Sequence, residues 1–562
     1  MPQGETQECL KENKMNKRTF CNPVNINYRY QPGYFGRESA DPLVVLYHGV
    51  YFLFASHGEG YWTSGDLVNW DFIKVDIKKF PDFELFAPGT CVVGDRLYIT
   101  FSQGGNILYS DNPFDPDSWV NIGRPYEWHD PAFLFDDDGY VYVYEGLGDR
   151  CLHASKLDPS DNMRLVEGPV PIFYSDYKNR GYDRCGDNNE IERMPSLEGG
   201  WVNKLNGRYY LTYATPGTEF STYCDGVAVS DSPMGPFENC DNSPTVFKST
   251  GFMRGAGHGA LFEDRNGNLW KIDTVSISVN HMFERRLCLF PAKIAEDGRL
   301  YTNALRGDYP MFYPHEVDDP FTGCDAGLHL LSYGAACSSS SVLDGAHAPG
   351  FAADENMKTW WSAETGNPGE WISLDLGEKF GVSSVQVNFA DQDIRDTTGR
   401  DNGFAYKYTL EVSDDGLDWR MLADRRDSCD DLSHDYYQFE DACFRFIKLT
   451  NHGTVPAGGR FAVSSIRVFG CGNGDAPEKA PVFEAVRDAD GRNMRVTWEE
   501  IEGAEGYFVR FGVDENELHT HYQIIGGTEA NVRCLINGVR YFIAVDAYNK
   551  NGIVKGTLTR FV

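Results

Sequence analysis

Short apolar and aromatic runs alternate with glycine-containing turns between residues 41 and 272. In the first unit, an acidic residue and a proline open the apolar run Asp41–Leu46, and a glycine turn leads to the aromatic run Tyr51–Phe54. Two β-branched or aromatic runs joined by Gly, Asn-Gly or Asp-Gly predict an antiparallel hairpin. No helical period competes with this pattern, so the region is predicted to be built from strands.

This unit occurs five times along the chain. The repeats begin at residues 41, 87, 130, 198 and 258, so they are 43 to 68 residues apart, which leaves room for four strands in each. Radial repetition of four-stranded sheets is the β-propeller arrangement. We therefore predict an all-β protein that begins with a five-bladed β-propeller over residues 26–325.

The remainder of the chain predicts a different organisation. A chain of 562 residues is too long for a single hydrophobic core. Short strands and polar loops over residues 335–471 predict a β-sandwich, and a second, smaller sandwich is predicted over residues 482–562 after an acidic linker that contains Gly and Pro. Residues 1–25 are polar and of mixed charge, which predicts a disordered or loosely packed leader.

The composition of the chain argues against certain classes of binding partner. The net charge of −32, from 83 acidic and 51 basic residues, argues against a nucleic-acid partner, because phosphates need basic patches. No apolar run is long enough for a transmembrane helix, so no membrane partner is expected. The first residues lack the apolar core of a signal peptide, which predicts a cytoplasmic protein, or a periplasmic or secreted one if an export signal lies outside this chain.

The 14 cysteines show no zinc-site spacing. Most are expected to be buried free thiols. Cys337 and Cys471 are different, because they bracket the first predicted sandwich, and a disulfide between them is possible in an oxidising compartment.

The residues that open the repeats carry the chemistry. In a propeller the first strand of each blade lines the central axis, so the opening residues converge on one funnel. They are Asp41, Ala87, Asp130, Glu198 and His258. Like charges raise one another's pKa, so one carboxyl holds a proton while another stays ionised, which is the pairing that glycosidic bond cleavage needs. Calcium binding is the competing use of such carboxylates, and simple strand termination is the structural alternative.

The repeat region resembles glycoside hydrolase family 43, a five-bladed β-propeller family. The motifs that carry the resemblance are Ser39-Ala40-Asp41-Pro42, Phe86-Ala87-Pro88, His129-Asp130-Pro131, Glu198-Gly199 and Gly257-His258-Gly259. The resemblance implies an inverting, mostly exo-acting hydrolase in which Asp41 is the general base, Glu198 the general acid, and Asp130 the residue that orients and tunes Glu198. It also places His258 near an axial water or ion, commonly assigned as calcium.

Substrate contacts are predicted at four further residues. The resemblance matches Arg286 to an arginine that points toward the substrate, with the neighbouring Arg285 as the alternative. Phe86 and His129 replace the tryptophan and the aliphatic residue that many family members have beside the sugar pocket. Trp62 is a candidate platform for a sugar ring, and an ordinary core aromatic is the equally weighted alternative.

The two sandwiches carry resemblances of their own. Residues 335–471 resemble the coagulation-factor C-type, discoidin-like module, on Trp360-Trp361-Ser362 and on the run Trp371–Gly377. In bacterial glycosidases this module acts as a family 32 carbohydrate-binding module, which implies a glycan ligand, although such modules are sometimes only spacers. Residues 482–562 are similar to fibronectin type III domains, which implies a spacing role.

Taken together, the sequence predicts an exo-glycosidase that releases a terminal sugar from plant-type oligo- or polysaccharides. An α-L-arabinofuranosidase is favoured, followed by a β-xylosidase and by a galactosidase or galactofuranosidase. A non-catalytic glycan-binding protein, and a transferase or phosphorylase on a similar fold, are the other classes. No cofactor is required for the chemistry, and calcium is possible at the axis or in the discoidin-like region. Inversion would place the carboxyl groups of Asp41 and Glu198 about 6.5–9.5 Å apart.

Overall fold

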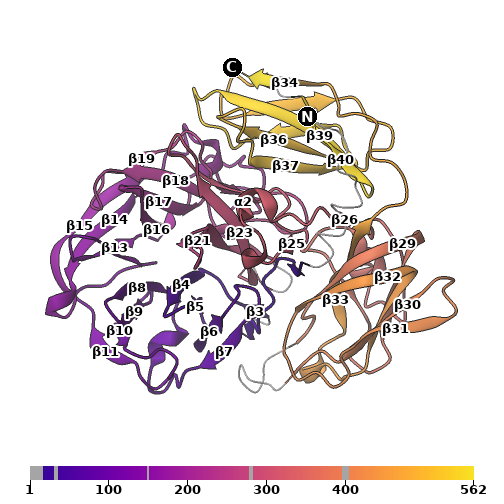
Figure 1. Cartoon of the computed structure of the whole chain (residues 1–562), viewed down its shortest axis with the longest axis horizontal. Coiled ribbons are helices and arrows are strands. Elements are labelled where there is room, and N and C mark those ends of the chain that lie inside the picture. The colour runs from indigo at the N-terminus through magenta and orange to yellow at the C-terminus, as the bar shows by residue number, and fades with distance from the viewer. Residues whose placement is uncertain are drawn as a thin grey trace.

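The computed structural model describes residues 17–30, 36–147, 151–277, 281, 283–394, 404–557 and 559–561. Nearly all regular structure in these residues is β-strand, and the helical elements are short turns such as α2 (Pro320–Gly323). Figure 1 shows a ring of sheets, drawn from indigo to magenta, with an orange sandwich beside it and a yellow sandwich above. We call the orange body the first sandwich (residues 329–471) and the yellow one the second sandwich (residues 483–561).

The ring is a five-bladed propeller, as the repeats predict. Four blades are four-stranded antiparallel sheets, and in blade 4 a fifth strand, β20, pairs with β18. The strands are β4 (Leu43–Tyr47), β5 (Val50–Phe54), β6 (Gly60–Ser64) and β7 (Asp71–Lys74) in blade 1; β8 (Gly89–Val93), β9 (Arg96–Thr100), β10 (Ile107–Ser110) and β11 (Val120–Gly123) in blade 2; β12 (Ala132–Phe135), β13 (Val141–Glu145), β14 (Cys151–Asp158) and β15 (Arg164–Tyr174) in blade 3; β16 (Glu198–Leu205), β17 (Arg208–Thr215), β18 (Cys224–Ser230), β19 (Glu238–Asn239) and β20 (Val246–Phe247) in blade 4; and β21 (Gly257–Glu263), β22 (Leu269–Ser276), β23 (Arg285–Ile294) and β24 (Leu300–Thr302) in blade 5.

Two-residue turns set the register of the first hairpins. Between β4 and β5, His48 and Gly49 have φ values of 48° and 80°, and between β16 and β17, Asn206 and Gly207 have values of 51° and 79°. Positive φ at both central residues is the type I′ pattern, whose twist matches that of the flanking strands. Each turn therefore fixes which residues of its blade face the core.

The N-terminal segment is ordered, which corrects the prediction of a loose leader for residues 17–25; residues 1–16 lie outside the described residues. Strand β1 (Thr19–Phe20) pairs with β25 (Met311–Phe312). The buried amide of Asn22 donates to the carbonyls of Leu289 (2.9 Å) and Gly307 (2.7 Å) and accepts from the Leu289 N–H (3.0 Å). A polar segment is thus tied into blade 5 by hydrogen bonds rather than by apolar packing alone.

The first sandwich is one curved antiparallel sheet in the order β26-β33-β29-β32-β30-β31, with β27 and β28 paired to β29 and β33. Two of its strands are unusually long, and shifts of register let them bend from one layer to the other. The strands are β26 (His329–Leu330), β27 (Ala336–Ser339), β28 (Trp361–Ser362), β29 (Trp371–Phe389), β30 (Tyr408–Ser413), β31 (Trp419–Asp424), β32 (His434–Asn451) and β33 (Ala462–Cys471).

The second sandwich packs directly on blade 4. Its strands form one sheet in the order β34-β35-β38 and another in the order β37-β36-β39-β40, with β41 paired to β39. The Gly181 N–H donates to the Leu535 carbonyl (2.8 Å), and a Cβ at Gly181 would lie 2.3 Å from the Arg533 carbonyl oxygen. Such close packing does not suit the predicted spacing role. The strands are β34 (Phe483–Arg487), β35 (Met494–Trp498), β36 (Gly506–Gly512), β37 (Thr520–Ile525), β38 (Glu529–Val532), β39 (Tyr541–Asn549), β40 (Gly552–Val554) and β41 (Thr559–Phe561).

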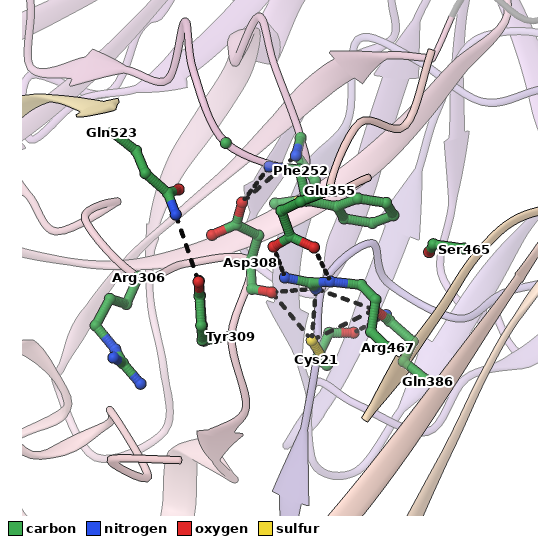
Figure 2. Close-up of polar contacts among 12 residues, drawn as sticks. Cys21, Phe252, Arg306, Asp308, Tyr309, Glu355, Gln386, Ser465, Arg467 and Gln523 are labelled. Atoms are coloured by element: carbon green, nitrogen blue, oxygen red, sulfur yellow. Dashed lines mark hydrogen bonds and ion pairs between the residues drawn. The ribbon is translucent and has the colours of Figure 1, made fainter. Parts of the chain in front are cut away.

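A buried arginine lies where the three bodies meet (Figure 2). Arg467, on β33, holds Glu355 through two bonds, Nη2 to Oε1 at 2.6 Å and Nε to Oε2 at 3.1 Å, and donates to the backbone carbonyl of Asp308. Gln523 of the second sandwich reaches the hydroxyl of Tyr309 beside it at 3.4 Å. Burying these charges is tolerable because Arg467 and Glu355 are paired within the first sandwich. The bonds that join the bodies are those from Arg467 to the Asp308 carbonyl and from Gln523 to Tyr309.

Two predictions from the sequence concern the state of the cysteines and the presence of membrane-spanning helices. The described cysteines are free thiols, including Cys337 and Cys471. Among the described residues, no helix has the length and apolar content that crossing a bilayer would require.

Candidate active site

A cavity of about 360 Å³ lies at the propeller axis. Its walls combine carboxylates, one imidazole and one guanidinium with three apolar side chains. The lining residues are Glu38, Asp41, Phe86, Gln103, Asp130, Leu147, Ser196, Glu198, Gly217, Thr218, Glu219, His258, Phe283 and Arg285. A larger groove of about 670 Å³ lies between blade 1 and the first sandwich, but none of the predicted catalytic side chains lines it.

The backbone turns sharply where each blade begins. The opening position of all five blades has a left-handed conformation, with φ from 41° to 57°, at Asp41, Ala87, Asp130, Gly199 and His258. Glu198 lies one residue before this position, so it is not the equivalent of Asp41 that the repeat alignment predicted. The carboxyl group of Glu198 nevertheless lines the cavity.

Asp41 is buried among positive partners. Its Oδ1 lies 3.3 Å from Arg285 Nη1 and 3.3 Å from His258 Nδ1, and its Oδ2 accepts from Ser56 Oγ at 2.5 Å. Burial alone would raise the pKa of Asp41, but the charges of Arg285 and His258 and the Ser56 bond together lower it below the usual value. Asp41 is therefore ionised at neutral pH.

Asp130 has the opposite tendency. Burial, reinforced by the negative charges of Glu198 and Asp41 and opposed by His258, raises the pKa of Asp130 to about 7. Near neutral pH, a proton is therefore shared within this group of carboxylates rather than lost to solvent.

Hydroxyl groups hold Glu198 from both sides. Tyr223 donates to Oε1 at 2.7 Å, and Ser196 donates to Oε2. The carboxyl group is thereby fixed in orientation at the cavity wall.

His258 connects the carboxylates at the axis. Burial works against its charged form, but the negative charges of Asp41, Asp130 and Glu198 outweigh burial and raise the pKa of His258 above its ordinary value. The imidazole therefore carries positive charge over a wider pH range and supports ionised Asp41 beside it.

The calcium ion predicted near His258 stays a prediction. The backbone N–H of His258 donates to Asp225, whose other oxygen lies 2.5 Å from the ammonium of Lys271; Asp273 lies 2.8 Å from the same ammonium. Lys271 therefore pairs with both of these buried carboxylates. No group of three or more His, Cys, Asp or Glu side chains among the described residues is placed to hold a metal ion.

Arg285, and not Arg286, faces the cavity. Arg285 holds Glu38 through Nε at 2.7 Å and reaches Asp41, whereas Arg286 points the other way and donates to His434 of the first sandwich at 2.9 Å. Neighbouring residues of a strand point to opposite faces, so only one of the two arginines can serve the site. The structure therefore places Arg285, the alternative residue, at the cavity. The prediction that Arg286 contacts the substrate is wrong.

Of the three predicted aromatic and histidine contacts, one lies at the cavity and two lie away from it. Phe86 lines the cavity and packs edge-on against His57. Trp62 is fully buried, and its indole N–H donates to Asn27 of the N-terminal segment at 2.6 Å, so it offers no face to a sugar. His129 is exposed and is not among the lining residues.

Several residues that line the cavity or hold its carboxylates were not predicted. Glu38 and Ser56 flank Asp41, and Tyr223 and Ser196 hold Glu198. A polar residue two or three positions from a predicted catalytic residue was the only signal for Glu38 and Ser196.

Gly199 leaves room for the imidazole of His258. A Cβ at Gly199 would lie 2.5 Å from His258 Cδ2, in a backbone with φ of 57°. Gly199→Ala is therefore expected to displace the imidazole and to lower the free energy of unfolding by about 1–3 kcal/mol more than backbone strain alone would. The measurement is urea unfolding, together with the NMR titration of His258.

The matched control is Gly207→Ala. Gly207 has a similar left-handed backbone, with φ of 79°, but no heavy atom lies within 4 Å of the added Cβ. Equal losses of stability and an unchanged His258 titration in the two variants would contradict the proposed collision.

Comparison with known proteins agrees with this geometry. Residues 36–300 match the family model for glycosyl hydrolases family 43, and residues 335–463 match the F5/8 type C domain. The chain is 29% identical over 196 residues to an arabinoxylan arabinofuranohydrolase from Paenibacillus polymyxa, covering 31% of this chain and 29% of that protein. It is 29% identical over 132 residues to a β-xylosidase from Xylanibacter ruminicola, covering 19% of this chain and 38% of that protein.

The chain thus spans about a third of the length of these two curated relatives. A solved structure described as a glycoside hydrolase is similar with a TM-score of 0.44 at 20% identity, covering 76% of this chain and 97% of that one. Both family matches coincide with bodies seen in the structure, the first with the propeller and the second with the first sandwich. The chain therefore contains a glycosyl hydrolases family 43 domain over residues 36–300, followed by an F5/8 type C domain over residues 335–463.

Proposed function

We propose that the chain is an inverting, exo-acting glycoside hydrolase that releases a terminal sugar from plant-type oligo- or polysaccharides. The observation that carries the proposal is the contrast within one cavity. The pKa of Asp41 is lowered beside Arg285, while the pKa of Asp130, next to Glu198, is raised to about 7. A cavity that holds an ionised base and a retained proton has both groups that glycoside hydrolysis requires.

Asp41 is the general base in this proposal. Its ionised carboxylate takes a proton from a water molecule while that water's oxygen attacks the anomeric carbon. Ser56 and Arg285 hold the carboxylate in place and keep it ionised between turnovers. Because the water attacks from the face opposite the leaving group, the product has inverted configuration.

Glu198 is the general acid. It gives its proton to the glycosidic oxygen as the bond to the anomeric carbon breaks, and the proton is recovered from solvent after product release. Asp130 acts as a positioning residue through Glu198, because burial and the nearby Glu198 raise the pKa of Asp130 to about 7 and keep a proton beside the general acid. Tyr223 and Ser196 keep the carboxyl group directed at the leaving oxygen.

An α-L-arabinofuranosidase is the favoured activity, with a β-xylosidase second and a galactosidase or galactofuranosidase third. The printed names of the relatives, an arabinoxylan arabinofuranohydrolase and a β-xylosidase, support the first two. The cavity is also the size of one or two sugar rings, and Phe86, Leu147 and Phe283 give it an apolar wall for the less polar face of a ring.

The choice of sugar is tested by turnover of a panel of nitrophenyl glycosides. We expect release of nitrophenol from the α-L-arabinofuranoside at a higher kcat/KM than from the β-xyloside, the galactoside or the galactofuranoside. The anomer formed first, followed by proton NMR, is expected to be inverted. Faster cleavage of the xyloside would select the second activity, and a retained first product would contradict the mechanism.

Substrates with different leaving groups distinguish the role of Asp41 from that of Glu198. Asp41→Asn is expected to lower kcat by about 10²–10⁴-fold on every substrate, because no other group can activate the water. Glu198→Gln is expected to lower it by a similar factor on an oligosaccharide but much less on a nitrophenyl glycoside, whose leaving group needs no proton. Steady-state kinetics on both substrate types provides the measurement.

Glu263→Gln, at the solvent-exposed end of β21, serves as the control and is expected to behave as wild type. If either catalytic variant keeps wild-type activity on the oligosaccharide while folded, the assignment of that residue is wrong.

The pH profile of kcat/KM follows from the two shifted carboxyls. Activity requires ionised Asp41 and a proton on the Asp130–Glu198 pair. It is therefore lost as pH falls through the lowered pKa of Asp41, and lost again as pH rises through about 7. We expect a bell whose alkaline limb moves in Asp130→Asn while the acid limb stays in place. A profile that is flat from weakly acidic to alkaline pH would contradict the assignment.

A further inference from the structure

Two pairs of consecutive residues, Arg37–Glu38 and Arg285–Arg286, lie at the boundary between the cavity and the first sandwich. Strand β3 (Arg37–Glu38) runs beside the start of β23, and the Ser39 N–H donates to the Arg285 carbonyl at 3.4 Å. In Figure 1, β3 lies at the side of the propeller that faces the orange sandwich. Because successive side chains of a strand point to opposite faces, each pair sends one side chain to the cavity and one to the sandwich.

On the cavity side, Glu38 and Arg285 form a buried ion pair. Arg285 donates to Glu38 through both Nε and Nη2, and its remaining Nη1 reaches Asp41. The position of this guanidinium decides how strongly it lowers the pKa of the proposed base.

On the sandwich side, Arg37 is fully buried between two carboxylates. Its Nε lies 3.1 Å from Asp391 Oδ2, and its Nη1 lies 2.7 Å from Asp431 Oδ1. Tyr406 donates to Asp391 Oδ1 at 3.0 Å. Both carboxylates that face Arg37 come from loops that join strands of the first sandwich, so that body supplies the counter-charge for a cation of the segment before blade 1.

Arg286 is held by a histidine of the same body. Its Nε donates to His434 Nε2 at 2.9 Å, and its Nη1 donates to the Arg37 carbonyl at 2.6 Å. An arginine can only donate, so His434 Nε2 must accept and His434 Nδ1 must carry the proton, which it gives to Asn388 Oδ1 at 2.7 Å. Burial, with the nearby charges of Arg286 and Arg37, lowers the pKa of His434 well below its ordinary value, which keeps this neutral form in place.

We propose that the first sandwich is a working part of the active site, and that His434 and Asp391 are positioning residues for Arg285 and Asp41. The connection is covalent and short. Arg286 is the next residue after Arg285, and Arg37 is the residue before Glu38. Through the Arg286 bond to the Arg37 carbonyl, the two sandwich residues fix both strands that carry the Glu38–Arg285 pair. The inference rests on the proposed role of Asp41.

The proposal predicts a catalytic defect from a change in a different domain. His434→Ala leaves Arg286 Nε buried without its acceptor, so β23 is expected to shift and to carry Arg285 away from Asp41. Since misplacement of a catalytic group by about 1 Å can cost 10²-fold, kcat is expected to fall by about 10- to 100-fold. Asp391→Asn, which removes the counter-charge of Arg37, is expected to act in the same direction.

The pH profile distinguishes positioning from loss of fold. The charged and titratable groups around Asp41 are Arg285, His258, His57, Glu38, Asp130 and Tyr223. If Arg285 withdraws, the pKa of Asp41 rises, so the acid limb of kcat/KM is expected to move to higher pH in His434→Ala. His434→Gln retains a side-chain oxygen that can accept from Arg286 and is expected to recover most of the activity and the wild-type limb.

The control is Val412→Ala, which truncates the buried core of the first sandwich away from these residues. It is expected to melt at lower temperature with unchanged kcat and an unchanged acid limb. Wild-type kcat and pH profile in folded His434→Ala and Asp391→Asn, while the wild-type enzyme cleaves its substrate, would overturn this inference alone. Failure of the wild-type enzyme on every glycoside of the panel would instead overturn the proposed function.

Discussion

Buried charge must be paired, and this constraint organises the centre of the molecule. The axis of the propeller brings several buried carboxylates together, where unpaired ionisation would be too costly. Arg285, His258 and Lys271 supply the positive charge. The three cations are not placed symmetrically, and their placement makes the carboxylates unequal. Asp41 lies against two cations and stays ionised, whereas Asp130 lies among other carboxylates and holds its proton more readily.

The same constraint acts at the boundaries between the bodies. Arg467, paired with Glu355 inside the first sandwich, donates to the Asp308 carbonyl where the three bodies join, and Arg37 meets Asp391 beside the cavity. In both places the contact crosses between the first sandwich and the propeller side of the molecule. Charged pairs of this kind specify one mutual arrangement of two surfaces, because any other arrangement leaves a charge buried alone. The three bodies are thus held in a defined relation rather than connected by linkers.

Local signals in the sequence were sufficient to predict the strands and turns of the propeller. The repetition of those signals was sufficient to predict which residues meet at the axis. Turns such as Asn206-Gly207 encode their own conformation, so each hairpin can be predicted without knowledge of the rest. Symmetry then brings Asp41, Asp130 and His258 together. Glu198 was displaced by one residue because Gly199, not Glu198, takes the left-handed position. The error left the convergence intact, since Glu198 still lines the cavity with Asp41 and Asp130.

What could not be predicted depends on contacts between distant segments. Both faces of the start of β23 are buried, so no alternation of polar and apolar residues marks which of Arg285 and Arg286 faces the axis. Trp62 is covered by Asn27, in a polar segment that gives no sign in the sequence of packing on blade 1.

The pairing of Arg37 and Arg286 with residues of the first sandwich also bears on how such a chain can change during evolution. Accessory modules in multidomain enzymes are commonly exchanged as cassettes, with only a linker to be rejoined. A module whose buried carboxylate balances a charge of its neighbour, and whose histidine accepts a hydrogen bond from it, cannot be exchanged in this way. Loss or transfer of the first sandwich would leave Arg37 and Arg286 buried without their partners from that body. The two bodies are therefore expected to be inherited together.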